Sequence, residues 1–361
     1  MMMPHPALES ARAFCQDYEI QIPVLMAPMA GACPASLAIA VANAGGMGAC
    51  GTLLMQPDAI AAWASEVRAN TNGGFQLNLW IPDPEPERHA DAEADVRAFL
   101  GQWGPEVAAD AGDAGPLDFE AQCQAMLNAG PPVISSIMGI YPEAFVAQMK
   151  ERNIKWWATA TTVAEAREAV AAGADVVVAQ GMEAGGHRGA FDAGKAGIDL
   201  VGLFSLLPAI VDAVDVPVVA TGGIGDARGA AAAFVLGASA VQVGTGLLRS
   251  PEASLPSAWA DAIGQATPEG TIATRAFSGR LGRSIKTAYV EAASSENTPE
   301  PAPYPVQRGL TGAMRGQASK DNDIDRMQAW AGQSAGLSEA LPATEIVTAM
   351  WDGVVRILER D

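Results

Sequence analysis

The chain has 361 residues, of which 49% are hydrophobic, and a formal net charge of -19. This length and hydrophobic content predict a globular protein with a sizeable core, and the acidic balance excludes a nucleic-acid partner, which requires clustered Lys and Arg. Four separated cysteines without a CxxC pair predict neither a disulfide framework nor a metal site, and no segment suits export or a bilayer span. We therefore expect a cytoplasmic protein with no membrane association.

Eight short apolar runs, each followed by a stretch with helical spacing, predict strands at 23–27, 47–50, 75–79, 133–136, 155–159, 176–179, 217–220 and 240–243. Helical patterns lie between them at 34–44, 57–70, 119–129, 143–152, 163–172, 203–213 and 226–236. This alternation predicts a parallel sheet. Eight such units favour an α/β fold of the closed (β/α)8 TIM-barrel type over an open doubly wound sheet, whose dinucleotide fingerprint is missing after the first strand.

Two segments depart from the alternation. Residues from about 81 to 118, which contain prolines, acidic residues and Trp103, are expected to form a solvent-facing acidic insertion after the third strand. The alternation ends after Arg249, and residues 250–361 are expected to form a mostly helical lid subdomain over the barrel mouth. The predicted organisation is therefore a barrel from 1 to 249 and a lid from 250 to 361.

Residues 180–189, QGMEAGGHRG, place a histidine in a glycine-rich loop directly after the sixth predicted strand. Barrel enzymes carry their active sites at this end of the strands, and histidine exchanges protons near neutral pH. We therefore expect His187 to be catalytic, against the alternative of a structural histidine. Glu183 in the same loop either orients this base or pairs with Arg188.

Glycine-rich loops also follow the seventh and eighth predicted strands, at 220–226 (ATGGIGD) and 241–246 (VQVGTG). Loops at these positions of a barrel often hold a phosphate through backbone N–H groups. Gly223 and the N–H groups of Gly244 and Thr245 are the expected cradle. The alternative is a pair of ordinary tight turns.

Three further residues lie at the ends of other predicted strands. Met29, in the APMA segment at 27–30, follows the first strand, where the backbone could face a flat ring. Asn78 and Gln180 end the third and sixth strands with uncharged amides that could bind a heterocycle. Such residues can instead satisfy loop backbone, so the expectation rests on their convergence at one rim.

Taken together, these motifs resemble the class I nitronate monooxygenases, formerly called 2-nitropropane dioxygenases, which are FMN-dependent barrels with a lid. The resemblance rests on 27–31 (APMAG) with 43–46 (NAGG), on 180–189, on 221–224 (TGGI) with 242–245 (QVGT), and on 304–307 (YPVQ) with 329–333 (AWAGQ). It implies that His187 lies beside the flavin. It also implies that FMN is bound by Met29, Asn78, Gln180, Gly185, Gly223, Gln242, Val243, Gly244 and Thr245.

The implied activity is the oxidation of alkyl nitronates, such as propionate 3-nitronate, by O2 to a carbonyl compound and nitrite. The implied partners are therefore a small nitronate and O2, and the expected state is a monomer or homodimer. A nitronate is already deprotonated, so His187 would need only to donate to the nitro group, whereas a neutral nitroalkane would require a base.

The sequence departs from the family pattern in two places. The second pocket histidine of the family is absent from 135–139 (SSIMG), and Ile137 and Met138 predict a more apolar pocket. The lysine that the resemblance implies after Tyr304 is absent from 307–312 (QRGLTG).

Two other functions remain open. One is an FMN and NAD(P)H-dependent enoyl-acyl-carrier-protein reductase, a related barrel that shares the EAGGH segment, although an acidic residue typically replaces Gln180 there. The other is a flavin-binding protein without turnover.

Overall fold

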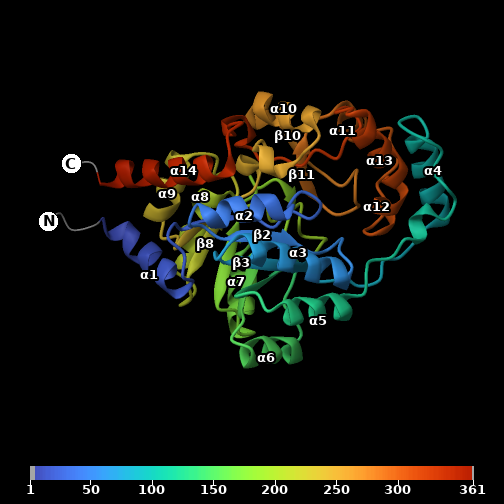
Figure 1. Ribbon diagram of the computed structural model, residues 1–361. Coiled ribbons are helices and arrows are strands. Elements are labelled where there is room, and N and C mark those ends of the chain that lie inside the picture. The colour runs from blue at the N-terminus through green and yellow to red at the C-terminus, as the bar shows by residue number, and fades with distance from the viewer. Residues whose placement is uncertain (1–4, 360–361) are drawn as a thin grey trace.

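The computed structural model describes residues 5–359 and has a closed barrel at its centre (Figure 1). The eight barrel strands are β1 (Val24–Met26), β2 (Gly48–Gly51), β3 (Phe75–Trp80), β4 (Val133–Ile137), β5 (Lys155–Ala160), β6 (Val176–Gln180), β8 (Val218–Thr221) and β9 (Ala240–Val243). All neighbours pair in parallel in the order β1-β9-β8-β6-β5-β4-β3-β2, and a parallel bridge between Leu25 and Met47 joins β1 to β2. The predicted TIM barrel is confirmed.

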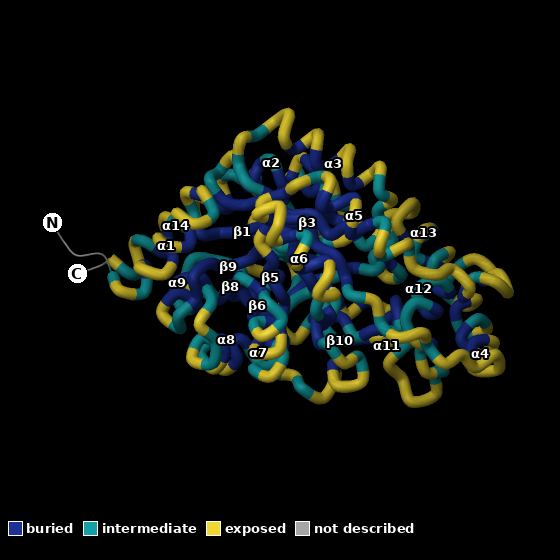
Figure 2. The backbone as a smooth tube through the Cα atoms, turned by 90° about the horizontal axis from the view of Figure 1, so that it is seen from below, coloured by how far each residue is buried: buried dark blue, intermediate teal, exposed yellow. Residues whose placement is uncertain are grey.

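Helices alternate with the strands and cover the outside of the barrel. They are α2 (Ala35–Asn43), α3 (Pro57–Asn70), α5 (Phe119–Ala129), α6 (Glu143–Glu151), α7 (Val163–Ala171), α8 (Leu203–Val211) and α9 (Ala227–Val235), with α1 (Glu9–Asp17) before the barrel. Local signals set their ends: Thr162 and Glu165 form a capping box on α7, and Asp226 accepts two backbone N–H bonds that begin α9. The strands are buried on both faces, which is typical of parallel sheets (Figure 2).

The insertion after β3 is mostly exposed to solvent, and one face of its helix packs against the C-terminal part of the chain. Its helix α4 (Ala90–Leu100) lies beside α12 (Val306–Leu310) and α13 (Gly312–Asp321) in both backbone views (Figures 1 and 2). Val96 and Leu100 join a second hydrophobic core with Phe277, Tyr289 and Met314 from the C-terminal part. This core anchors the C-terminal segment next to the barrel mouth.

The C-terminal part contains strands as well as helices. Its elements are α10 (Ser257–Gln265), β10 (Thr271–Thr274), β11 (Gly282–Ile285), α11 (Ala288–Ala293), α12 and α13. Strands β10 and β11 form a three-stranded sheet with β7 (Gly186–His187), a short strand in the segment expected to be a loop. We refer to residues 257–333 as the lid, because side chains from this segment line the cavity at the barrel mouth.

The last helix, α14 (Ala343–Leu358), packs on the barrel wall, although the sequence assigned it to the lid. It contacts α9 and α2, through buried side chains that recur at helical spacing, at Ala343, Ile346, Val347, Met350 and Val354. The predicted boundary at residue 249 otherwise stays a prediction. Among residues 5–359, no helix combines the length and apolarity needed to cross a bilayer.

The packing of α14 can be tested by truncating one buried side chain. Met350→Ala is expected to lower the free energy of unfolding by about 2–5 kcal/mol, because it removes buried apolar surface and leaves a cavity. Ile357→Ala on the same helix is the control: this side chain is 42% exposed, and its loss is expected to change stability by less than about 0.5 kcal/mol. Denaturant titrations measure both, and equal losses would contradict the packing described.

Candidate active site

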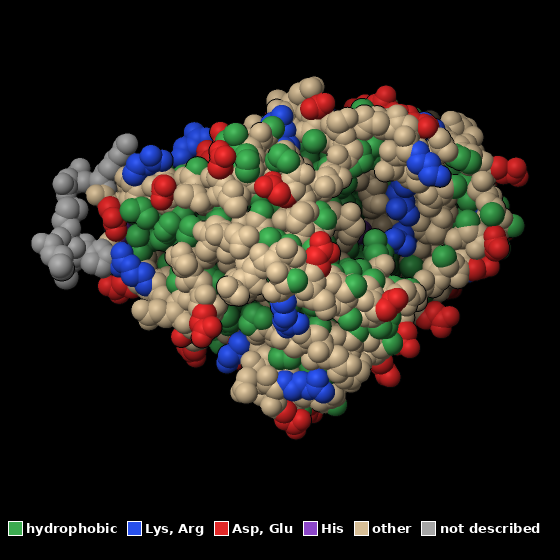
Figure 3. Space-filling view, in the orientation of Figure 1, with side chains coloured by type: hydrophobic (Ala, Val, Ile, Leu, Met, Phe, Trp, Pro, Cys, Tyr) green, Lys and Arg blue, Asp and Glu red, His purple; other side chains and the backbone are tan. Residues whose placement is uncertain are grey.

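A cavity of about 590 Å³ opens where the carboxyl ends of the barrel strands meet the lid. This volume is within the range of pockets that hold a cofactor or a small molecule. The space-filling view shows a hollow in the region of α12 and α13, with Lys or Arg side chains at its wall (Figure 3). The cavity is therefore lined by barrel loops on one side and by the lid, with its arginines Arg308 and Arg315, on the other.

The structure brings the predicted site residues together at this cavity, with one exception. Its lining includes Met29, Asn78, Gln180, Gly185, His187, Gly223, Gln242, Gly244 and Thr245. The side chain of Val243 lies instead in the core around the barrel, because successive side chains of a strand point to opposite faces. Val243 can thus contribute to the cavity only through its backbone.

His187 is fixed by contacts from both sides of the cavity. Its strand β7 pairs antiparallel with β11, with Gly282 opposite His187. The imidazole lies between two indoles, with ring centroids 4.8 Å from Trp80 and 5.0 Å from Trp330. Its Nε2 lies 2.8 Å from the hydroxyl of Ser278. The barrel and the lid together set the position of this ring.

The hydrogen bonds of Ser278 indicate which nitrogen of His187 carries the proton. The Ser278 hydroxyl lies 3.1 Å from the carbonyl oxygen of Arg280, to which it donates its single proton. It must then accept at the 2.8 Å contact, so His187 donates from Nε2. This tautomer leaves Nδ1 with a free lone pair.

The surroundings of His187 keep its ring neutral. Burial is the main cause that lowers the pKa of His187 to about 3. The positive charges of Arg280, Arg308 and Arg315 make a smaller contribution in the same direction. Because this pKa lies below the ordinary value of about 6.5, the folded protein holds the neutral ring throughout the physiological range.

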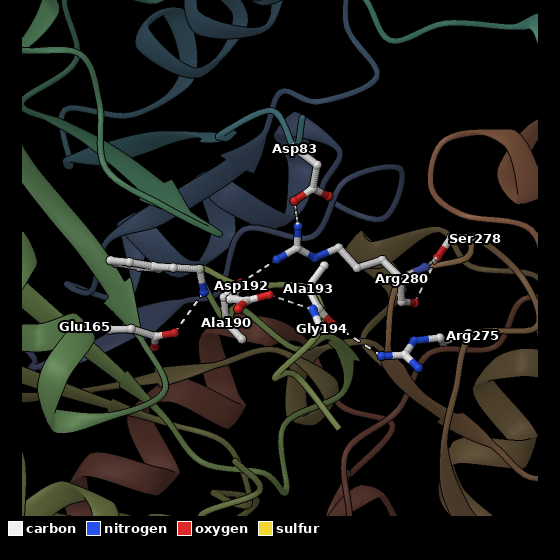
Figure 4. Close-up of polar contacts among 10 residues, drawn as sticks. Asp83, Glu165, Ala190, Asp192, Ala193, Gly194, Arg275, Ser278 and Arg280 are labelled. Carbon is white, nitrogen blue, oxygen red and sulfur yellow. Dashed lines mark hydrogen bonds and ion pairs between the residues drawn. The ribbon is translucent and has the colours of Figure 1, made fainter. Parts of the chain in front are cut away.

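Arg280 connects the lid to two barrel loops. It is buried, and its guanidinium donates to the carboxylate of Asp83 and to the carbonyl of Ala190 (Figure 4). The guanidinium carbon lies 5.7 Å from the centre of the Trp80 ring, which in turn stacks on Tyr304 at 4.6 Å. These contacts hold the aromatic wall beside His187.

The loop that follows β7 is also fastened by polar contacts. The N–H of Phe191 donates to Glu165, the N–H of Gly194 donates to Asp192, and Arg275 from the lid donates to the carbonyl of Ala193 (Figure 4). These bonds connect the loop to α7 on one side and to the lid on the other.

The amide side chains of Gln180, Asn78 and Gln242 differ in which of their hydrogen-bonding atoms lack a protein partner in the described residues. Gln180 is occupied by the histidine strand, since it donates to the carbonyl of His187 and accepts from the N–H of Gly189. Asn78 donates to the Ser135 hydroxyl at 3.0 Å, and Gln242 accepts from another amide at 3.0 Å. Within residues 5–359, Oδ1 of Asn78 and Nε2 of Gln242 have no protein partner, which leaves an acceptor and a donor for a heterocycle.

Glu183 neither hydrogen-bonds to His187 nor forms an ion pair with Arg188 within residues 5–359. Its carboxylate accepts two hydrogen bonds from the backbone N–H of Leu203, at the first residue of α8. Arg188 instead donates to backbone carbonyls, including that of Gln180 at 2.5 Å. The favourable interaction of a carboxylate with a helix start explains the position of Glu183.

The two glycine loops present unpaired backbone donors to the cavity. In the part of the chain that the structure describes, the N–H groups of Gly222, Gly223, Gly244 and Thr245 donate to no protein acceptor. Gly222 and Gly223 have positive φ angles of 105° and 71°, which side chains rarely adopt. Because these partly exposed residues line the cavity and successive backbone N–H groups can bind an anion, this cradle fits a group such as a phosphate.

The lid supplies site residues that the sequence analysis missed. Ser278 and Trp330 contact His187, and Arg308 and Arg315 line the cavity from α12 and α13. Trp330 lies in the motif 329–333 and Arg308 in the segment 307–312. Both segments were compared with the family pattern, so the sequence could have indicated these two residues. Ile137, the last residue of β4, and Met138, which follows it, line the cavity from the barrel side.

The fold and the cavity define a (β/α)8-barrel enzyme with its site at the carboxyl ends of the strands. A family model described as nitronate monooxygenase matches residues 12–353, and the chain belongs to this family. Its members are flavin-dependent oxidoreductases that act on nitronates. The resemblance drawn from the motifs is therefore confirmed.

Relatives and solved structures agree with this assignment. A probable nitronate monooxygenase of Staphylococcus aureus is 34% identical over 351 residues, which covers 95% of this chain and 97% of the relative. A nitroalkane oxidase structure from Streptomyces ansochromogenes superposes with a TM-score of 0.86 at 32% identity, covering 94% and 97%. FabK from Thermotoga maritima is also similar, with a TM-score of 0.74 at 27% identity, covering 99% and 98%.

The neutral state of His187 can be tested by nuclear magnetic resonance, because the chain has three histidines. The imidazole nitrogen shifts of His187 are expected to stay those of the neutral Nε2–H tautomer from pH 8 to pH 5, since its pKa is lowered to about 3. His187→Gln assigns the signals by their loss. A titration midpoint above pH 5 in the ligand-free protein would contradict the electrostatics described.

Proposed function

We propose that this chain oxidises alkyl nitronates, such as propionate 3-nitronate, with O2 to a carbonyl compound and nitrite, and that its flavin is FMN. The observation that carries the proposal is the position of neutral His187 at a cavity that also has an unpaired N–H cradle. The family assignment supports nitronate oxidation in general. We further propose that the protein acts in the cytoplasm, which its four free cysteines support.

The residues at the cavity fit FMN. The N–H groups of Gly223, Gly244 and Thr245 would hold its phosphate, and Asn78 Oδ1 and Gln242 Nε2 would bind the polar edge of its ring system. Bound FMN supplies the redox chemistry, because its ring accepts electrons from an organic substrate and returns them to O2.

The protein itself would bind and orient the anionic substrate. Arg280, Arg308 and Arg315 give the surroundings of His187 a positive potential, which attracts a nitronate. A bound anion favours the protonated imidazole, so His187 can take up a proton and then donate to the nitro group. For a neutral nitroalkane, the lone pair on Nδ1 would instead act as the base.

The flavin type can be tested by removing the cofactor and reconstituting the protein. FMN is expected to bind at least about a hundredfold tighter than riboflavin, because hydrogen bonds to a charged group contribute about 1.5–3 kcal/mol each. The flavin absorbance spectrum and quenching of flavin fluorescence measure both affinities. Equal affinities would refute a phosphate in the cradle.

The reaction is tested by oxygen uptake with propionate 3-nitronate, ethylnitronate and NADPH offered separately. Uptake is expected with the nitronates, accompanied by nitrite. His187→Ala is expected to keep its flavin and to lose at least about a hundredfold in kcat/KM, the low end of contributions from positioned acid–base groups. His89→Ala, an exposed histidine on the insertion, is the control and is expected to keep full activity.

Two outcomes would favour the other functions. Anaerobic bleaching of the flavin by NADPH, without oxidation of any nitronate, would favour an enoyl reductase. The similarity to FabK is the reason for testing this alternative. A yellow protein that reacts with none of the three compounds would indicate a flavin-binding protein without turnover.

A further inference from the structure

Two cysteine side chains lie in contact next to the barrel mouth and take no part in the function proposed above. The sulfur of Cys33, in the segment between β1 and α2, lies 3.8 Å from the sulfur of Cys50 on β2. Within residues 5–359, no other two cysteine sulfurs are in hydrogen-bonding contact, and all four cysteines are free thiols. Two free thiols in contact are the starting point for a disulfide.

The cavity lies directly beside this pair. Ala32, the residue before Cys33, and Gly51, the residue after Cys50, both line it. Cys33 is 8% exposed, whereas Cys50 is only 1% exposed. A small oxidant therefore reaches Cys33 more readily than Cys50.

The surroundings of Cys33 favour its thiolate, which is the reactive form of cysteine. The backbone N–H of Gly51 donates to the sulfur of Cys33 at 3.2 Å. Hydrogen bonding by the Cys50 thiol and by backbone N–H groups lowers the pKa of Cys33, although burial opposes this change. The pKa of Cys50 is raised, because its contact with Cys33 and its burial both favour the neutral thiol. The two thiols thus differ as an attacking and a resolving cysteine do.

The segment that precedes Cys33 forms part of the cavity wall. All residues from 27 to 32 line the cavity, and the N–H of Ala32 donates to the carbonyl of Met29 at 2.8 Å, which closes a turn. Cys50, in contrast, is held in the barrel sheet by the pairing of β2 with β3. A disulfide bond is much shorter than the present contact, so its formation would draw the turn towards β2 and change the wall at Met29.

We propose that Cys33 and Cys50 form a site of reversible oxidation, at which hydrogen peroxide converts the two thiols to a disulfide and thereby weakens flavin binding. The thiolate of Cys33 attacks one oxygen of the peroxide, so that an S–O bond forms and the O–O bond breaks. The leaving hydroxide takes up the proton lost by Cys33 and departs as water. The Cys50 sulfur then attacks the sulfenic acid, an S–S bond forms, the S–O bond breaks, and the Cys50 proton leaves with the oxygen as a second water.

The two thiols together lose two electrons, which reduce one peroxide to two waters. A thiol reductant reverses the change by exchange with the disulfide. The effect on the flavin rests on the flavin binding proposed above, whereas the oxidation of the thiols does not.

The disulfide can be detected by mass spectrometry in the flavin-loaded Cys15→Ala protein. Trypsin releases residues 13–68 as one peptide, because this stretch contains no internal Lys or Arg, and in this variant its only thiols are Cys33 and Cys50. After treatment with hydrogen peroxide, the unfolded peptide is expected to take up no iodoacetamide and to have lost two hydrogens, and dithiothreitol should reverse both changes. Full uptake of iodoacetamide after peroxide would overturn the proposal.

Single-thiol variants in the same background test which sulfur attacks the peroxide. In Cys50→Ala, Cys33 has no resolving partner, and it is expected to accumulate a sulfenic acid that dimedone traps. Cys33→Ala is expected to give at least about tenfold less dimedone adduct, because Cys50 is more deeply buried and its pKa is raised. Equal labelling of the two variants would overturn the proposed chemistry.

The effect on the flavin is measured by flavin fluorescence as the affinity before and after oxidation. The oxidised Cys15→Ala protein is expected to bind its flavin at least about fivefold more weakly, and dithiothreitol should restore the affinity. Additional replacement of Cys123, a buried thiol outside the pair, by Cys123→Ala is the matched control and should leave this response unchanged. Cys33→Ala should abolish the response. An unchanged affinity after the disulfide has formed, or an equal loss in Cys33→Ala, would overturn the proposal.

These readouts also separate the thiol pair from the proposed function. If the disulfide forms and weakens flavin binding in a protein that oxidises no nitronate, the oxidation site stands and the proposed function fails. If nitronates are oxidised but peroxide leaves both thiols of the pair reactive towards iodoacetamide, the function stands and the oxidation site fails.

Discussion

The antiparallel pairing of β7 with β11 joins the barrel to the lid at the residue on which the chemistry depends. His187 lies opposite Gly282 in this pair, so the strand that carries the histidine is also the strand that receives the lid. The same pairing brings Ser278 and Trp330 to the imidazole. Without the lid, the ring would lose its proton acceptor and one of its two indole neighbours, and neither its tautomer nor its orientation would be fixed.

The cavity has a charge opposite to that of the whole molecule. The chain carries a net charge of -19, yet three arginines act on His187 and two of them have no carboxylate partner within residues 5–359. An anionic substrate is repelled by the average surface at long range and attracted at short range. Screening by salt reduces the first effect more than the second, because exposed charges are screened more than buried ones.

The sequence predicted what local patterns determine. Valine-rich runs and glycine loops specify barrel strands and their carboxyl ends, so Gly223, Gly244 and His187 could be placed at one rim before the structure was known. Contacts between distant segments could not be predicted. A two-residue strand such as β7 has no periodicity to read, and the partners of Glu183 and Gln180 depend on how a loop folds back. Val243 shows the limit of motifs, which do not distinguish the two faces of a strand.

The charges of the lid and the protonation of His187 are thermodynamically linked. Arg308 and Arg315 lower the pKa of His187, so an anion that neutralises them must raise that pKa. Linkage is reciprocal, and protonation of His187 must therefore strengthen anion binding by the same factor. Burial is the larger cause of the low pKa of His187, so a bound anion raises this pKa only by the part that the arginines contribute. The lid would then contribute to the reaction by changing the charge that His187 experiences, in addition to covering the barrel mouth.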